Sequence, residues 1–300
     1  MHRLTELADK HKSDKGALVG SATGFALIYE YLLGHLSNEK VKILEIGLNN
    51  GGPEHGSDRF YRIIKDCPSI KMWHEYFSKG DIWGFDINDV DETLLASLKR
   101  FRFFKGDQGN IESYKKFKNL ITKTYGENDG FDIIIDDGSH AFYHQQMSFA
   151  HLSEHVKPGG FYVIEDLYWQ PNKDQGGDKA GGTAPFDVSK LPKTVNTRKL
   201  FDAIYIGPQN NHIQYKNRGA MSYRQLKGDP NIPWLTKEDL LEHIDLLRAR
   251  RPEYADILFN ESRQYDRITV SASALPDWLP KFNYKAILIL RKRKENEDVI

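Results

Sequence analysis

Five short apolar runs, each closing on or beside a glycine or an acidic residue, most constrain how this chain can fold. They cover residues 41–47, 81–87, 101–107, 131–136 and 160–166. Each run is rich in β-branched or aromatic residues and has the length of a buried strand. Helix-like stretches lie between them, at 69–77, 91–100, 111–125 and 142–156. The alternation predicts βαβ units, and therefore an α/β protein with a doubly wound, mostly parallel, Rossmann-like sheet covered on both faces.

The flanking segments predict three parts. We expect an N-terminal helical segment (1–38) with a helix over 22–36, a sheet core (39–166 plus 264–292), and an inserted helical and loop lid subdomain (167–263). The core is closed by two further strands, over 266–273 and 284–292, with the closing strand antiparallel. The insertion contains a Gly-rich loop at 172–185 and an amphipathic helix at 235–251.

Aromatic residues of the insertion have two interpretations. Phe201, Tyr205, Tyr215, Tyr223 and Trp234 could form a platform for a sugar beneath a lid, or they could be the core of the inserted subdomain.

Composition excludes several classes of function. Lys and Arg total 42 and Asp and Glu total 42, so charge gives no reason to expect a nucleic-acid partner. Cys67 is the single cysteine, so no internal disulfide can form and a metal would need oxygen or nitrogen ligands. With no secretory signal and no apolar run of about 18 residues, we expect a cytoplasmic protein without a membrane span.

Polar groups or glycines stand at the carboxyl end of each of the first five predicted strands, where an open α/β sheet binds its ligands. In strand order they are Glu45 and Gly47; Asp86; Asp107 and Gln108; Asp136, Asp137 and His140; and Glu165 and Asp166. A single acid at such a position is more often a helix cap or a solvated turn. Polar ends on five consecutive strands favour a ligand site.

Some of these residue types suggest a particular ligand. An acid after the second strand, here Asp86, is a common partner of ribose hydroxyls, and Asp107 and Gln108 could hydrogen-bond an adenine edge. Three carboxylates converging after the fourth and fifth strands would need a counter-charge. The simplest is a hard divalent cation, Mg²⁺ in the first place, with Mn²⁺ or Ca²⁺ as alternatives.

The segments LEIG, GFDI, GDQ, FDIIIDDGSH and GGFYVIEDLYW, in this order, resemble the S-adenosylmethionine- and Mg²⁺-dependent sugar O-methyltransferases, including those that act on macrolide sugars. The resemblance covers roughly residues 10–170, and DDGSH followed by IED is its specific part. HKSDKG, which contains Ser13, Asp14 and Lys15, is similar to a short TDK motif of that family.

The resemblance implies a class I methyltransferase fold and a role for each matching residue. Asp137, Glu165 and Asp166 would be the metal ligands, and His140 would be the general base that deprotonates a metal-bound sugar hydroxyl. The cofactor S-adenosyl-L-methionine would be bound by Glu45, Gly47, Asp86, Asp107, Gln108, Asp136 and Lys15. The substrate would be a sugar or a small-molecule glycoside.

Three departures from the family pattern concern the acceptor side. Residues 53–68 form an extra segment, Thr23 stands where many members have histidine, and the insertion after residue 167 is long. The helices that flank 53–68 could mediate a homo-oligomer.

Three alternatives to a sugar O-methyltransferase stay open. A metal-dependent methyltransferase of phenols or catechols would share the cofactor and the ion. A nucleotide-cofactor oxidoreductase or epimerase would need a tighter G-x-G-x-x-G turn and a Tyr-x-x-x-Lys base, and neither occurs in a suitable place. A non-enzymatic scaffold with a relic site would not need the intact carboxylates and histidine.

Overall fold

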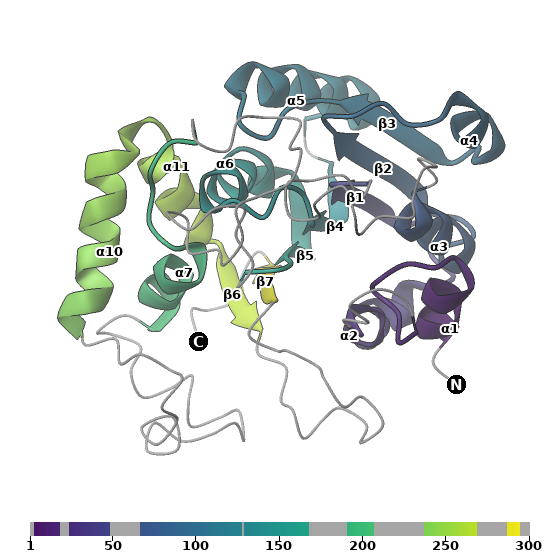
Figure 1. Ribbon diagram of the computed structural model, residues 1–300, viewed down its shortest axis with the longest axis horizontal. Helices are drawn as coiled ribbons and strands as arrows, with labels where there is room; N and C mark the ends of the chain where they lie inside the picture. The colour runs from purple at the N-terminus through teal and green to yellow at the C-terminus, as the bar shows by residue number, and fades with distance from the viewer. Residues whose placement is uncertain are drawn as a thin grey trace, which may run out of the picture.

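A single seven-stranded sheet organises the computed structural model, which describes residues 3–18, 24–48, 67–127, 129–167, 191–206, 237–268 and 287–294 (Figure 1). The strand order is β3-β2-β1-β4-β5-β7-β6. The strands are β1 (Lys42–Ile46), β2 (Asp81–Asp86), β3 (Phe101–Lys105), β4 (Phe131–Asp136), β5 (Val156–Ile164), β6 (Tyr265–Ile268) and β7 (Leu288–Lys292). The first five strands pair in parallel, while β7 is antiparallel to both β5 and β6. The predicted doubly wound sheet with an antiparallel closing strand is confirmed.

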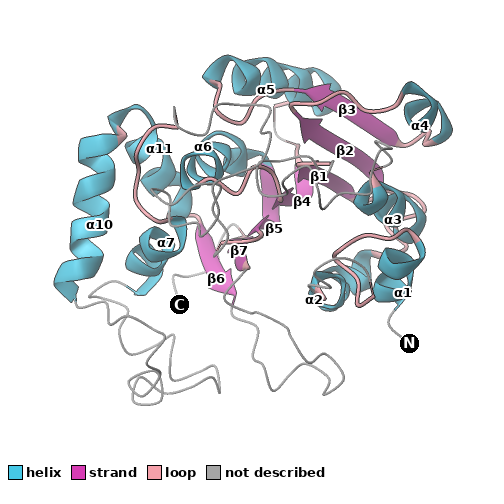
Figure 2. Ribbon diagram, viewed as in Figure 1, coloured by secondary structure: helices cyan, strands magenta, loops and turns pink. Residues whose placement is uncertain are grey.

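Helices cover both faces of this sheet (Figure 2). They are α1 (Arg3–Lys10), α2 (Phe25–Leu33), α3 (Pro68–Tyr76), α4 (Glu92–Ser97), α5 (Ile111–Tyr125), α6 (Phe142–Leu152), α7 (Thr197–Ile206), α10 (Lys237–Arg250) and α11 (Pro252–Ser262), with 3₁₀ turns at Gly34–Leu36 and Ser153–His155. Local chemistry explains several starts. Asp91 and Asn110 cap α4 and α5 by accepting backbone N–H groups, and α3 and α11 each begin at a proline.

Side chains alternate between two cores along each central strand. Ile43, on β1, packs in the cluster that contains α1, α2 and α3, whereas its neighbour Leu44 packs in the cluster that contains α5, α6, α7 and α11. This alternation follows from the two-residue period of a strand. Figure 1 accordingly shows α1, α2 and α3 together on one side of the sheet and α6, α7, α10 and α11 on the other. The sheet is therefore buried on both faces, as a parallel sheet requires.

Described helices of the predicted insertion belong to the second of these cores. Phe201 and Tyr205 of α7 are buried in the same cluster as Leu44, together with Leu258 of α11. These two aromatics are therefore core residues, as one of the two interpretations predicted. Tyr215, Tyr223, Trp234 and the Gly-rich loop lie outside the described residues. The lid and the three-part division of the chain stay predictions.

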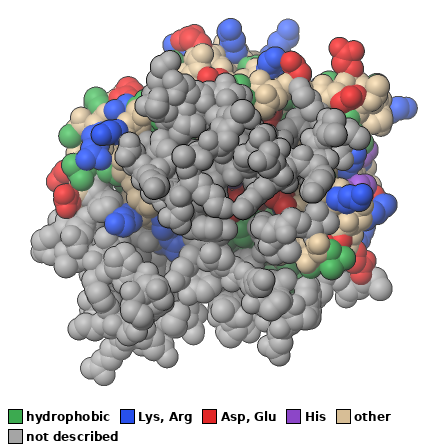
Figure 3. Space-filling view, in the orientation of Figure 1, with side chains coloured by type: hydrophobic (Ala, Val, Ile, Leu, Met, Phe, Trp, Pro, Cys, Tyr) green, Lys and Arg blue, Asp and Glu red, His purple; other side chains and the backbone are tan. Residues whose placement is uncertain are grey.

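Surface charge and helix hydropathy bear on the expected partners. In the described part of the face shown in Figure 3, acidic and basic side chains are interspersed at the rim. Among the helices of the described ranges, none combines the length and the apolar character needed to cross a membrane. The cytoplasmic location stays a prediction.

Candidate active site

The carboxyl ends of β1, β4 and β5 lie next to one another at one edge of the sheet. In the parallel ladders Asp136 is paired with Ile46 on one side and with Ile164 on the other. The residues that follow these positions therefore leave the sheet at the same level. Asp137 and Glu165 donate backbone N–H groups that continue the ladders, to Ile46 and Asp136 respectively, at 2.9 Å. Register alone thus brings the acids after β4 and β5 together, as the sequence predicts.

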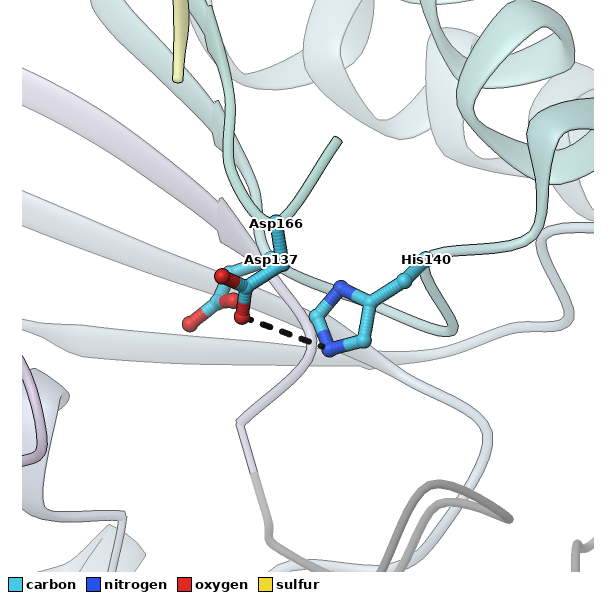
Figure 4. A group of neighbouring side chains, drawn as sticks. All are labelled: Asp137, His140 and Asp166. Atoms are coloured by element: carbon cyan, nitrogen blue, oxygen red, sulfur yellow. Dashed lines mark ion pairs between the residues drawn. The ribbon is translucent and has the colours of Figure 1, made fainter. Parts of the chain in front are cut away.

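Asp137, His140 and Asp166 form one cluster at this edge (Figure 4). One ligand-type atom from each side chain lies within 4.8 Å of the others. The Nε2 atom of His140 is 3.8 Å from Oδ2 of Asp166. Asp137 and His140 come from the loop between β4 and α6, while Asp166 follows the end of β5, so two segments supply the cluster.

The backbone at two of these residues is unusual. His140 has a φ of 62° and Asp166 a φ of 50°, so both adopt the left-handed conformation that non-glycine residues rarely use. Such conformations cost free energy, and they gather at functional sites where the surrounding structure imposes them. Here they turn the side chains of His140 and Asp166 toward each other.

A buried lysine lies among the carboxylates beside this cluster. Lys15, only 1% exposed, places its Nζ atom 2.5 Å from Oδ2 of Asp137, 2.8 Å from Oε2 of Glu165 and 3.4 Å from Oε1 of Glu45. Although burial alone would lower it, the pKa of Lys15 is raised well above its ordinary value, because Asp137, Glu165 and Glu45 surround the ammonium group. Lys15 therefore remains charged and bridges the ends of β1, β4 and β5.

One ammonium group does not compensate all the acids at this edge. Burial raises the pKa of Asp166 to about 6 and that of Glu45 to about 7, against the opposing charges of His140 and Lys15 respectively. The pKa values of Asp137 and Glu165 are also raised, mainly by burial. A further positive charge nearby would stabilise the ionised form of these buried carboxyl groups. Lys15 leaves part of the negative charge of these carboxylates unneutralised. Carboxylate oxygens are the ligands that hard divalent cations prefer, so the residues present suit the predicted metal.

Glu165 differs from Asp137 and Asp166 in its surroundings. Its Oε1 atom accepts a hydrogen bond from the hydroxyl of Tyr29 at 2.5 Å, and its Oε2 atom accepts one from Lys15. A carboxylate has further lone pairs available after accepting two hydrogen bonds. The two hydrogen bonds thus leave Glu165 able to bind an ion as well, and metal ligation by Glu165 stays a prediction.

Residues predicted to bind the cofactor surround the ends of β1 and β2. Asp86 accepts backbone N–H groups from Leu48 and Asn88, both at 2.7 Å, so it orders the turn that follows β1. The indole of Trp73 donates to Oε2 of Glu45 at 3.2 Å. Asp86 thus holds Leu48, the residue after Gly47, while Glu45 lies on β1 just before this turn, where we predict that a cofactor approaches the backbone.

A second polar group links the ends of β3 and β4. Gln108 donates from Nε2 to Oδ1 of Asp136 and to Ser148, both at 2.9 Å, and its Oε1 accepts the N–H of Ser139. Within the described residues, the buried Oδ2 atom of Asp136 has no hydrogen-bond partner, and burial raises the pKa of this carboxyl to about 6. An orphaned acceptor of this kind suits a ligand that donates a hydrogen bond.

Direct contacts of a cofactor with this group remain predictions. Asp107 accepts the N–H of Gly109 at 2.7 Å, which shapes the loop after β3. The amide of Gln108 is already used to hold Asp136 and the loop that leads to His140.

At Gly47 the turn after β1 closely approaches the loop after β4, and a substitution tests how tight this approach is. Gly47 has a φ of +84°, and a Cβ atom placed on it would lie 2.1 Å from the carbonyl oxygen of Asp137. Gly126 has a similar φ of +90° but nothing within 4 Å of its would-be Cβ, so it is a matched control. We expect Gly126→Ala to cost about 1–3 kcal/mol through backbone strain, and Gly47→Ala to cost about 1–3 kcal/mol more through overpacking. Urea titration of the two variants without ligands measures this difference, and equal losses would show that the close approach is not tight.

Two functional candidates escaped sequence reasoning. Tyr29 is hidden in an apolar helix and Trp73 in an amphipathic one, so neither stands out as a polar site residue. Thr23 and residues 53–66 of the extra segment lie outside the described residues.

Comparison with known proteins finds relatives of this chain in sequence and in fold. No protein-family model matches the chain. Mycinamicin VI 2''-O-methyltransferase from Micromonospora griseorubida is 38% identical over 172 residues, which are 55% of this chain and 37% of that protein. Demethylmacrocin O-methyltransferase from Streptomyces fradiae is 34% identical over 195 residues, 64% of this chain and 43% of that protein. The chain thus spans less than half the length of these two relatives.

A solved structure is similar along nearly the whole chain. The MycE methyltransferase of the mycinamycin biosynthetic pathway, crystallised with Mg and S-adenosylhomocysteine, is 26% identical with a TM-score of 0.54. The match covers 98% of this chain and 55% of that one. The class I methyltransferase fold predicted from the sequence is confirmed.

Proposed function

Because the chain resembles the sugar O-methyltransferases in sequence and in fold, as its motifs indicate, we propose that it transfers a methyl group from S-adenosylmethionine to a hydroxyl of a sugar or glycosylated natural product, with the help of a divalent ion. The observation that carries the proposal is the convergence of Asp137, His140 and Asp166 at the carboxyl edge of the sheet. Mg²⁺ is the proposed ion because two carboxylates of this cluster offer oxygen ligands.

The chain's own residues would perform two tasks. When bound, S-adenosylmethionine supplies an electrophilic methyl group and the ion acidifies a hydroxyl that coordinates it. Nε2 of His140 would accept the hydroxyl proton, since imidazole is suited to this role near neutral pH. Asp166, 3.8 Å away, would stabilise the imidazolium that results. Asp137, Glu165 and Asp166 would hold the ion, as the sequence motifs predict, and the turn at Gly47 would let the methyl donor approach the backbone.

The proton and the bonds balance without another reactant. The bond between the methyl carbon and sulfur breaks, its electron pair stays on sulfur, and a bond forms between the methyl carbon and the acceptor oxygen. The protein therefore contributes mainly the position of the reactants and removal of the proton.

Two alternatives differ from this proposal in a testable feature. An oxidoreductase or epimerase is disfavoured, because the antiparallel β7 between β5 and β6 is the arrangement of a methyltransferase sheet. A phenol or catechol methyltransferase shares the fold, the cofactor and the ion, so only the acceptor separates it from a sugar enzyme.

Binding and turnover experiments distinguish these functions. We expect S-adenosylhomocysteine, and not NAD, to raise the melting temperature. With a panel of glycosylated macrolides and catechols, we expect the glycoside to gain the mass of one CH₂ unit, because a methyl group replaces the hydroxyl proton. EDTA should abolish this product and added Mg²⁺ should restore it, because the acidified hydroxyl depends on the ion. A chelator-insensitive product, or stabilisation by NAD alone, would contradict the proposal.

A further inference from the structure

We propose that Tyr29 is a positioning residue that, together with Lys15, fixes the Glu165 carboxylate and thereby sets the affinity of the site for its divalent ion. The inference rests on the proposed function and adds to it two residues of the N-terminal helical segment. The family resemblance implies a cofactor role for Lys15 and no role for Tyr29, so an action of either residue on the metal goes beyond it.

Both oxygens of Glu165 are bound by this segment. Tyr29 donates its hydroxyl to Oε1 at 2.5 Å and Lys15 donates Nζ to Oε2 at 2.8 Å. Gln145 donates to the backbone carbonyl of the same residue at 3.3 Å. Glu165 is only 2% exposed, so solvent has little access to these positions. The carboxylate is therefore held in one orientation by donors from two directions.

The ring of Tyr29 is itself held in place. It is fully buried and packs edge-on against the indole of Trp73, with ring centroids 5.3 Å apart. That indole also donates to Glu45. The tyrosine hydroxyl cannot leave Glu165 without disturbing this packing, so the hydrogen bond is preorganised.

Lys15 is anchored equally well. Its carbonyl oxygen accepts the N–H of Ala26 at 2.9 Å, so the loop is fixed to the start of α2. Asp9 of α1 accepts the N–H groups of Ala17 and Leu18 at 2.8 and 2.9 Å. The loop that carries the lysine is thus tied to both N-terminal helices, and its ammonium group reaches the acids from a fixed base.

This arrangement has the features of an outer shell around a metal. Partners that hydrogen-bond a ligand fix its direction and leave its remaining lone pairs for the ion. Glu165 directly precedes Asp166 of the cluster. A shift of Glu165 would therefore displace the carboxylates of both Glu165 and Asp166. Losing such a partner typically lowers metal affinity by about 10- to 100-fold.

The test compares Tyr29→Phe with Tyr265→Phe. Tyr265 is equally buried and donates its hydroxyl to the carbonyl of Ser153 at 2.6 Å, beside the opposite end of β5. Each variant loses one buried hydroxyl hydrogen bond and keeps the ring. We expect Mn²⁺, titrated by electron paramagnetic resonance, to bind Tyr29→Phe about 10- to 100-fold more weakly than the wild type. Tyr265→Phe should bind it normally, and S-adenosylhomocysteine should bind all three proteins with similar affinity.

A kinetic measurement covers the case in which Tyr29→Phe is less stable. The Mg²⁺ concentration for half-maximal methyl transfer should rise, while kcat at saturating Mg²⁺ should recover toward the wild-type value. Equal Mn²⁺ affinity in wild type and Tyr29→Phe would overturn the inference and leave the proposed function standing. If the wild-type protein bound no Mn²⁺, that result would instead contradict the metal dependence of the proposed function.

Discussion

His140→Ala is expected to lower kcat by about 100- to 10,000-fold, the usual contribution of a general base. Its Nε2 atom is the imidazole nitrogen that faces Asp166 in the cluster, so alanine removes the proton acceptor without removing a carboxylate. Steady-state methyl transfer measures the loss. The affinity for S-adenosylhomocysteine, measured by calorimetry, should change little.

His155→Ala is the matched control for this variant. His155 lies just before β5, at the amino end of the strand whose other end precedes Asp166, and its Nε2 atom is 3.9 Å from Oε1 of Glu154. We expect this variant to retain turnover. A His140→Ala enzyme with a near-normal rate would remove the base assignment.

Asp166→Ala is expected to reduce metal-dependent turnover by about 1,000-fold or more, because a bound ion contributes several kcal/mol to such a reaction. The variant removes a carboxylate from the proposed metal site and the partner of His140 at once. Turnover should be measured across a range of Mg²⁺ concentrations, and Mn²⁺ binding should be measured in parallel.

Asp266→Ala controls for the loss of a half-buried ion pair. The side chain of Asp266 is 25% exposed, close to the 21% of Asp166, and lies 3.5 Å from Nε of Arg293. It is on β6, away from the proposed site. If Asp166→Ala kept a chelator-insensitive rate, a metal-free mechanism would have to replace the one proposed.

Strand ends were the part of the site that sequence could predict. An apolar run that stops at Asp136 and another that stops before Glu165 define where two strands leave the sheet. Parallel pairing then fixes which residues lie level with each other, and Asp136 is indeed paired with Ile164. The convergence of the carboxylates follows from local pattern plus topology.

Boundaries that depend on distant pairing were less predictable. The helix expected over 142–156 ends at Leu152, a 3₁₀ turn follows, and Val156 already belongs to β5. Its partner in the ladder is Phe131, and that pairing is invisible in the local sequence. Helices α1, α7 and α11 were not predicted as elements either.

The N-terminal contribution to the site lay beyond sequence reasoning for a similar reason. Tyr29 and Glu165 are 136 positions apart, and Lys15 and Glu165 are 150 apart. Seven of the nine residues of α2 are buried, so nothing in its pattern marks one tyrosine as a donor to a carboxylate. Only packing of that helix against the sheet edge reveals it.

The left-handed backbone at His140 and Asp166 restricts which amino acids these two positions can accept over evolution or in a mutant library. Asparagine and aspartate tolerate this conformation best among non-glycine residues, and histidine is also enriched in it, whereas β-branched side chains are strongly disfavoured. Sequence drift at position 166 should therefore favour asparagine or glycine over valine or threonine, whatever the chemistry demands. Loop shape admits aspartate, asparagine and glycine at position 166, and of these only aspartate supplies the carboxylate that the proposed chemistry needs.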